Sequence, residues 1–198
     1  MAKAEITIEQ IKKLKELSGA GLTDAKQALV EAEGDFDKAL EAMRKKGLTK
    51  AEKRGDRETR EGLVEAYIHD GRLGAIVEVN CETSFVAKTD EFKTLAHQIA
   101  MQVASMAPLY VSEDDIPEAD RAAKLKELES NFKGPENMKD KILEGQIKKA
   151  FSDKVLMNQP YILDDSKTVE QFIKEAIAKT GENITIRQFK RIELGVTE

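Results

Sequence analysis

Apolar residues recur every three or four positions through residues 1–48, which predicts three short amphipathic helices. Thr7 and Gln10 have the spacing of a capping box at the start of the first helix. Thr23 and Asp35 are the expected N-caps of the second and third helices. The residues expected to end the three helices are Gly19, Gly34 and Gly47. The pattern therefore predicts a small bundle with few large apolar residues, only marginally stable by itself.

The period of the apolar residues then changes to two, which is typical of β-strands. Residues 62–69 and 73–81 alternate and are rich in β-branched side chains. Asp70 and Gly71 between them are a strong signal for a hairpin turn. Residues 184–194 alternate again and predict a third strand.

Helical patterns occupy the sequence between the second and third strands. Thr89 is the expected cap of a helix that continues to about residue 106, and residues 168–178 predict another helix. Two polar helices, at 118–130 and about 136–151, are separated by a Gly-Pro pair and predict a protruding helical hairpin at about 118–151.

This order of elements predicts an α+β protein with three parts. Residues 1–48 form the three-helix bundle, and residues 49–61 are charged, have no apolar periodicity and form a linker. Residues 62–198 form a core with a three-stranded antiparallel sheet packed by helices, and this core carries the hairpin.

Composition narrows the class of protein. The net charge of −5 argues against a nucleic-acid binder, although a local basic patch stays open. There is no apolar run of membrane-spanning length, the N-terminus lacks the apolar stretch of a signal peptide, and the single cysteine cannot form an intrachain disulfide. We therefore expect a cytoplasmic protein without a membrane segment.

Sequence signatures of enzymes and metal sites are missing. The chain has no Gly-rich phosphate loop, GxSxG, HExxH or CxxC motif, so no enzymatic activity, cofactor or metal is expected. His69 and His97 are far apart in sequence, and His97 is interpreted as a packing or surface residue rather than a catalyst. Cys81 alternates with apolar residues in a predicted strand and is interpreted as a small buried side chain rather than a reactive thiol.

Phe85 is the unusual feature of the sequence, because it follows the end of a strand and precedes the next helix. Periodicity leaves two alternatives open. The ring packs beneath the end of the sheet, or it is an apolar wedge presented to a partner, since large aromatic residues are favoured at interfaces.

Several segments together resemble one family, the bacterial translation elongation factors Ts. The first is LKELSGAGLTDAKQALVEAEGDFDKALEAMRKKGL at 14–48, and the second is EVNCETSFVAK at 78–88. Further similar segments are HQIAMQVA at 97–104, QPYI at 159–162, SKTV at 166–169 and GENITIR at 181–187. The segments occur in the family's order over nearly the whole chain, and the length resembles the short type with one sheet unit.

The resemblance implies guanine nucleotide exchange on elongation factor Tu, with GDP released by disturbance of the partner's Mg²⁺ and phosphate site. The residues implied in contact with the GTPase domain are Gly19, Ala20, Gly21, Leu22 and Thr23. Those implied next to the partner's Mg²⁺ are Thr83, Ser84, Phe85 and Val86, with Phe85 as the wedge; His97 and Met101 are candidate contacts of the core. The family usually has an acidic residue at the position of Ser84. A neutral serine cannot displace Mg²⁺ by charge, so insertion of Phe85 becomes the favoured mechanism.

The short type of the family further implies a homodimer, for which strand edges and a hairpin are available. Two other functions stay open. The three-helix N-terminus resembles ubiquitin-associated modules, which would make the protein a passive adaptor. Basic clusters at Arg44-Lys45-Lys46 and Lys53-Arg54 would suit an RNA-binding accessory, although a solvated helix face and linker explain them better at this net charge.

Overall fold

The computed structural model describes residues 6–18, 20–132, 134–135 and 138–196. The chain divides into two compact units. Unit 1 comprises Met1–Val64, Glu78–Ala96 and Gln171–Ile186, and unit 2 comprises Glu65–Val77, His97–Glu170 and Arg187–Glu198. No helix in the described part of the chain is long and apolar enough to cross a membrane.

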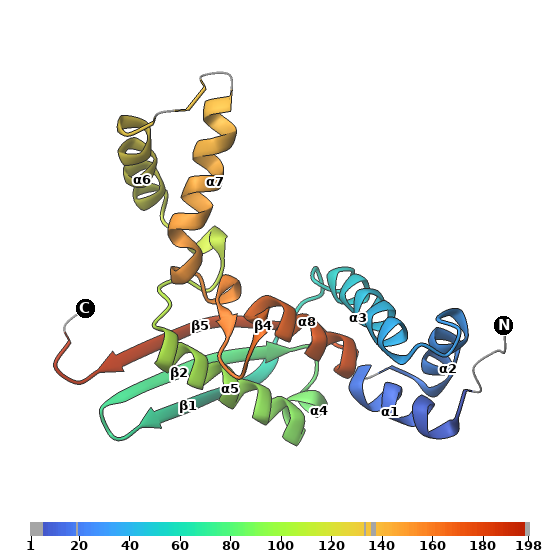
Figure 1. Cartoon of the computed structure of the whole chain (residues 1–198). Helices are drawn as coiled ribbons and strands as arrows, with labels where there is room; N and C mark the ends of the chain where they lie inside the picture. The colour runs from blue at the N-terminus through green and yellow to red at the C-terminus, as the bar shows by residue number, and fades with distance from the viewer. Residues whose placement is uncertain (1–5, 19, 133, 136–137, 197–198) are drawn as a thin grey trace. The chain divides into compact units, whose positions relative to one another are not determined.

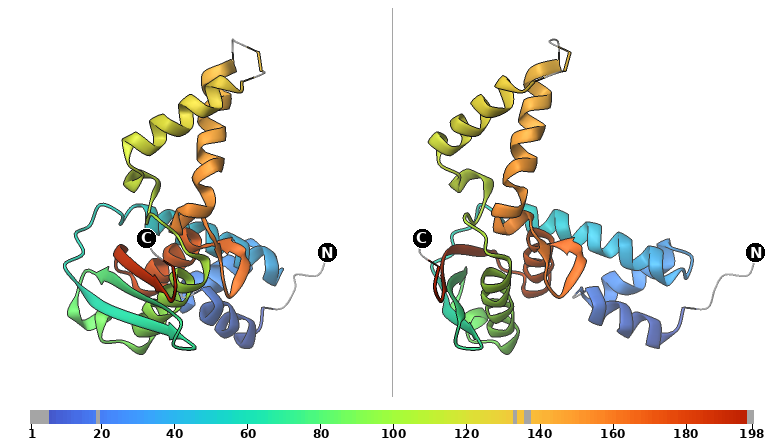
Figure 2. Two further views of the ribbon diagram at one scale, coloured as in Figure 1. Left: turned by 90° about the vertical axis from the view of Figure 1, so that its left-hand side faces the viewer. Right: turned by 60° about the vertical axis from the view of Figure 1, so that its left-hand side comes forward.

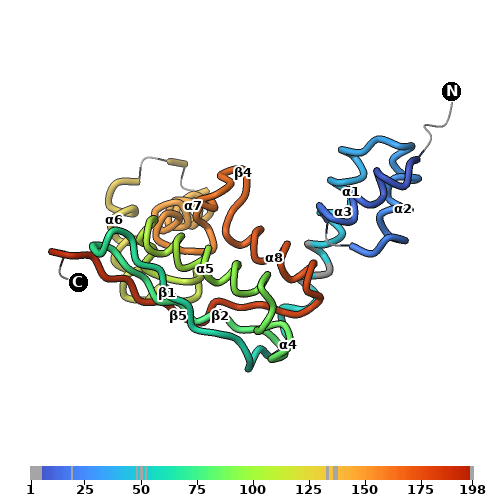
Figure 3. Tube along the Cα trace, turned by 90° about the horizontal axis from the view of Figure 1, so that it is seen from below, coloured from blue at the N-terminus to red at the C-terminus, as the bar shows by residue number. Residues whose placement is uncertain are grey.

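Three helices of unit 1 form the N-terminal bundle, α1 (Ile8–Ser18), α2 (Leu22–Glu31) and α3 (Phe36–Glu52), which Figure 3 shows gathered together. The predicted capping box is confirmed, because the Thr7 amide donates to Gln10 Oε1 at 3.0 Å and the Gln10 amide donates to Thr7 Oγ1 at 3.2 Å. Asp35 caps α3 as predicted, accepting a hydrogen bond from the Lys38 amide. The buried residues of the bundle are Leu14, Ala25, Ala28, Leu29, Ala39 and Met43.

Two predicted helix boundaries in the bundle are wrong. The N-cap of α2 is Gly21 rather than Thr23, which lies inside the first turn. Gly47 does not end α3, which continues to Glu52. A Cβ at Gly47 would lie 3.2 Å from the Cβ of Ala178, so the glycine lets two helices approach closely, and this packing outweighs its low helix propensity. Gly34 does follow the end of α2, with a φ of +86°, whereas Gly19 lies outside the described residues.

The main sheet contains β1 (Glu61–His69), β2 (Leu73–Cys81) and β5 (Ile184–Glu193), in the order β1-β2-β5. Neighbouring strands run antiparallel, as the arrows in Figure 1 show. Asp70 and Gly71 both have positive φ, +50° and +66°, which confirms the predicted hairpin turn. The α+β class, the three-helix N-terminus and the three-stranded sheet are therefore confirmed.

Two helices follow β2, α4 (Ser84–Ala87) and α5 (Asp90–Met106), and helix α8 (Val169–Thr180) precedes β5. Thr89 caps α5 as predicted, since the Phe92 amide donates to its hydroxyl at 3.2 Å. Within unit 1, Lys179 near the end of α8 forms an ion pair with Glu91 near the start of α5. The single-turn helix α4 was not predicted.

Unit 2 contains the helical hairpin, α6 (Glu118–Ser130) and α7 (Lys139–Phe151), which projects from the rest of its unit (Figure 2). Short 3-10 turns lie at Glu113–Asp115, Ser152–Lys154 and Leu156–Asn158. A second sheet, β3 (Pro160–Tyr161) with β4 (Asp164–Thr168), was not predicted.

A buried glutamine on α5 holds the β3 segment in place. The Gln102 side-chain amide donates to Gln159 Oε1 and to the Pro160 carbonyl, both at 3.1 Å, and its oxygen accepts from the Ile162 amide at 2.8 Å. Both glutamine side chains are fully enclosed, so these bonds satisfy polar groups that water cannot reach.

Candidate functional site

Phe85 lies on α4, a single helical turn after β2, and its side chain is 79% exposed. No other large apolar side chain in the described part of the chain is as exposed. The alternative in which the ring packs beneath the sheet is therefore wrong. Thr83 caps the turn, because its hydroxyl accepts from the Val86 amide at 3.4 Å and its carbonyl accepts from the Ala87 amide at 3.2 Å.

Buried residues before and after the exposed ring anchor the turn to its own unit. Val86 is only 7% exposed, and Ala87 is also buried. Cys81 is fully buried, and its thiol lies 3.2 Å from the Thr83 carbonyl, to which it donates. Burial raises the pKa of the Cys81 thiol, and the nearby charge of Glu182 raises it further. The interpretation of Cys81 as a small buried side chain is thus confirmed.

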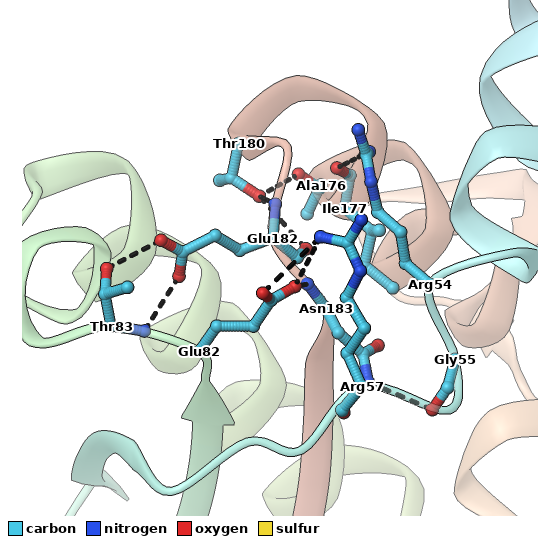
Figure 4. Close-up of polar contacts among 10 residues, drawn as sticks. All are labelled: Arg54, Gly55, Arg57, Glu82, Thr83, Ala176, Ile177, Thr180, Glu182 and Asn183. Carbon is cyan, nitrogen blue, oxygen red and sulfur yellow. Dashed lines mark hydrogen bonds and ion pairs between the residues drawn. The ribbon is translucent and has the colours of Figure 1, made fainter.

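A carboxylate from a distant part of the chain holds the cap of this turn. Glu182 Oε2 accepts from the Thr83 backbone amide at 3.0 Å, and Oε1 accepts from the Thr83 hydroxyl at 2.6 Å. Figure 4 shows both bonds reaching from the segment after α8 to the start of α4. Gly181, with a φ of +79°, begins that segment where α8 ends.

The neighbouring residues extend this contact into a network. Glu82 Oε1 accepts from the Asn183 backbone amide at 2.6 Å and lies 3.3 Å from Arg57 Nη1. The pKa of Glu82 is lowered, first by the bond from the Asn183 amide and then by Arg57.

The side chain of Asn183, which is almost fully buried, connects the network to the end of the bundle. Its amide nitrogen donates to the Gly55 carbonyl at 3.1 Å and to the Arg57 carbonyl at 2.8 Å. Arg54 donates to the Ile177 carbonyl near the end of α8 at 3.3 Å (Figure 4). Sequence reasoning matched the segments containing Glu82, Glu182 and Asn183 to family motifs but gave these residues no role.

The second set of predicted contact residues begins in the bundle at the start of α2. Ala20 is half-buried against the bundle core, whereas Gly21, Leu22 and Thr23 are exposed. Gly19, the first residue of the set, lies outside the described residues. The set therefore offers an apolar side chain, Leu22, beside the exposed amino end of a helix.

His97 and Met101 lie on the part of α5 that belongs to unit 2. His97 Nδ1 is 3.1 Å from Glu65 Oε1, and its ring meets that of Tyr67 edge-on with centroids 5.6 Å apart. The Tyr67 hydroxyl is 2.8 Å from His69 Nδ1, so both histidines contact one tyrosine. His97 is half-exposed and contacts Glu65 and Tyr67, as a packing or surface residue would. Met101 is half-buried.

The turn from Thr83 to Ala87 thus presents an aromatic ring and the hydroxyl of Ser84 on a capped, anchored frame. In the part of the chain that the structure describes, no group of three or more His, Cys, Asp or Glu residues is arranged to hold a metal ion. What the turn can do is bind: an exposed aromatic ring gains free energy when a partner covers it.

Comparisons with known proteins agree on one family. A family model described as Elongation factor TS matches residues 3–196. A protein named Elongation factor Ts from Thermotoga sp. (strain RQ2) is 52% identical over 194 residues, which cover 96% of this chain and 97% of the relative. Proteins of the same name from Rippkaea orientalis, 50% identical over 97% of this chain and 79% of the relative, and from Coprothermobacter proteolyticus, 47% identical over 96% and 99%, are also similar.

Proposed function

The chain belongs to the elongation factor Ts family, and from this premise we propose that it is a guanine nucleotide exchange factor for elongation factor Tu in translation elongation. It binds the GDP-loaded GTPase in the cytoplasm and promotes release of GDP. It does so by contact alone, needs no cofactor of its own and breaks no covalent bond.

The exposure of Phe85 carries the proposal for the mechanism. A ring that is 79% exposed contributes little to its own fold and is available to a partner. Inserted beside the Mg²⁺ and phosphate site of elongation factor Tu, it displaces the elements that hold the ion. Loss of Mg²⁺ removes charge neutralisation from the phosphates and weakens the hold on GDP.

Thermodynamic linkage sets the size of the effect. If the factor binds the nucleotide-free GTPase better than the loaded form, nucleotide and factor weaken each other's binding by the same ratio. For each tenfold loss of nucleotide affinity, the factor must bind the nucleotide-free GTPase about 1.4 kcal/mol more tightly than the loaded form. Insertion of the ring, together with contacts from Leu22 and its neighbours to the GTPase domain, supplies that difference.

Because residue 84 is a serine, we propose that the Phe85 ring, rather than a carboxylate charge, disturbs the partner's Mg²⁺ site. Ser84 is exposed at the first position of α4 and is neutral, so it cannot displace Mg²⁺ by electrostatic competition. We expect Ser84→Asp to change the exchange rate by less than about threefold, equivalent to under 1 kcal/mol. A rise of tenfold or more would restore weight to charge-based displacement.

Release of fluorescent GDP from elongation factor Tu tests the proposed function. Adding catalytic amounts of this protein should accelerate release, and the rate should saturate as its concentration increases. Binding to elongation factor Tu without any change in release would instead favour a passive adaptor. Unchanged release and no binding would overturn the proposal altogether.

We also propose that two copies associate through the face of the sheet that α5 does not cover. In unit 2, Glu65 on β1 and Arg191 on β5 both contact α5, through His97 and through the Ala104 carbonyl. Because side chains alternate along a strand, the neighbouring positions face the other way. On β2, Ala75 and Val77 are buried, so Ile76 between them faces away from the core. The isoleucines on this opposite face are exposed: Ile68 by 71%, Ile76 by 47% and Ile192 by 76%.

Light scattering tests the dimer. One chain has a mass of 22.1 kDa, so the dimer should give twice that value. Ile76→Lys places a charge in the middle strand and should return the mass to that of one chain. Leu163→Lys, at an exposed apolar position of the β3–β4 connection, is the matched control and should leave the dimer intact. A wild-type mass of 22.1 kDa at micromolar concentration would contradict the proposal.

A further inference from the structure

Two consecutive residues, Glu182 and Asn183, bond to two segments that lie far from them in sequence. Glu182 reaches Thr83, 99 residues away, through both the backbone amide and the hydroxyl. The Asn183 side chain reaches Gly55 and Arg57, 128 and 126 residues away. All of these contacts lie within unit 1, and Figure 4 shows them side by side.

The first arm of this arrangement orients the turn that carries Phe85. Helix α4 has four residues, too few to be stable as an isolated helix, so its direction depends on the buried Val86 and Ala87 and on what holds its cap. The Thr83 hydroxyl has a single proton, which it donates to Glu182, and this leaves an oxygen lone pair for the Val86 amide. The carboxylate therefore fixes the cap twice, through the amide directly and through the orientation of the hydroxyl.

The second arm holds the segment through which the chain leaves the three-helix bundle. Helix α3 ends at Glu52, and Gly55 and Arg57 lie three and five residues after it. The Asn183 amide group uses both of its N–H donors on their carbonyls, while its backbone N–H is taken by Glu82. One buried side chain thus fixes the exit of the bundle against the start of β5.

We propose that Glu182 and Asn183 are positioning residues that hold the Phe85 turn and the exit of the bundle in one frame. This inference rests on the proposed exchange function, because it assigns the frame to the two parts that would contact the GTPase. A ring already held in its bound direction loses less conformational freedom on insertion than a ring on a mobile turn. We call this pair of residues, Glu182 and Asn183 with their hydrogen bonds, the clamp. The clamp therefore acts through Phe85 and does not touch the partner's nucleotide site.

A mutant cycle separates positioning from general stability. We expect Glu182→Ala to lower the maximal rate of GDP release by roughly 3- to 10-fold, the cost of ordering one turn on binding. In a Phe85→Ala background the same substitution should change the rate by less than about twofold, because there is no ring left to position. Glu182→Gln, which keeps one acceptor oxygen, should recover part of the loss. Glu129→Ala on α6 removes an exposed carboxylate from unit 2 and should match wild type.

A merely structural role of Glu182 would slow release by the same factor in both backgrounds, and that result would overturn the inference. So would a Glu182→Ala protein that releases GDP at the wild-type maximal rate.

Amide hydrogen exchange of the isolated protein reads the clamp without any partner. The Thr83 amide should exchange at least about tenfold faster in Glu182→Ala than in wild type, while amides in the middle of β2 keep their protection. Unchanged Thr83 exchange would refute the clamp. Failure of the wild-type protein to release GDP, with the Thr83 result as expected, would refute the proposed function and the assignment of the clamp to exchange, while leaving the clamp itself in place.

Discussion

Replacing Phe85 by alanine should leave the fold intact and slow nucleotide exchange. About one-fifth of the side chain is buried in the free protein, since 79% is exposed. Full burial of a phenylalanine contributes about 1.5–3 kcal/mol, so the truncation should cost about 0.3–0.6 kcal/mol of stability. Alanine also has the higher helix propensity in α4, which offsets part of that loss. Phe92, seven residues later, is 1% exposed, and the same substitution there should cost about 3–5 kcal/mol.

The effect on exchange follows from the surface that the partner would cover. If the exposed part of the Phe85 ring is buried on insertion, it contributes about 1.2–2.4 kcal/mol to the exchange-active complex. That corresponds to a rate about 8- to 60-fold lower for Phe85→Ala at limiting concentration. The two estimates differ enough that stability loss cannot account for the slower exchange.

Stopped-flow release of fluorescent GDP and urea unfolding should be measured on the same preparations. Leu163→Ala, which truncates an exposed apolar side chain elsewhere, should show neither effect. Phe85→Ala at wild-type rate would refute the wedge, even with family membership unchanged. A Phe85→Ala protein that loses more than about 2 kcal/mol of stability would show that the ring supports its own fold instead.

Four further substitutions or conditions test the frame of the molecule. Gly62→Ala should lose about 2–4 kcal/mol in urea unfolding, because Gly62 has a φ of +152° and an added Cβ would lie 2.2 Å from a β2 carbonyl oxygen. Gln102→Leu should lose about 3 kcal/mol, because the buried Gln159 Oε1 would lose the hydrogen bond from Gln102, and the Pro160 carbonyl and the Ile162 amide would lose theirs. The thiol of Cys81 should react slowly with a disulfide reagent at pH 8 until urea unfolds the chain, because burial raises its pKa. Lowering the pH should remove the stability that Glu82 contributes. Its folded pKa lies below the ordinary value of 4.5, so that contribution is complete above 4.5 and lost as pH falls through the folded pKa.

Each of these expectations has a clear contrary result. Wild-type unfolding midpoints for Gly62→Ala or Gln102→Leu would mean that the backbone or the amide network relaxes without cost. Rapid labelling of the native thiol would place Cys81 near the surface. For Glu82, the comparison is Glu82→Gln: if wild type and variant lose stability in parallel below pH 4.5, the acid sensitivity comes from other carboxylates.

Most features set by residues three or four positions apart could be predicted from the sequence, although the N-cap predicted at Thr23 was wrong. The caps at Thr7, Asp35 and Thr89 and the turn at Asp70-Gly71 depend on local hydrogen bonds and backbone preferences. In such interactions both partners lie within the same short segment of the chain, so a local sequence pattern indicates them directly.

Features set by tertiary packing could not be predicted in this way. Gly47 resembles a helix stop, but the close approach of Ala178 keeps α3 going to Glu52. The β3 strand is held by Gln102, more than 50 residues earlier, and its two residues are too few to show a period. In both cases the deciding contact is absent from the local sequence.

The site shows the same division most clearly. Periodicity left the direction of Phe85 open, because a single residue after a strand has no pattern of its own. Its direction is decided by the burial of Val86 and Ala87 and by a carboxylate 99 residues away. The turn can evidently enclose apolar side chains, since it buries the two that follow the ring. Folding stability alone would favour burial of the largest of the three side chains, yet Phe85 is the one left exposed to solvent. Such local conflicts are expected where a residue serves binding. Truncating Phe85 should therefore separate exchange from folding, whereas truncating Val86 should not.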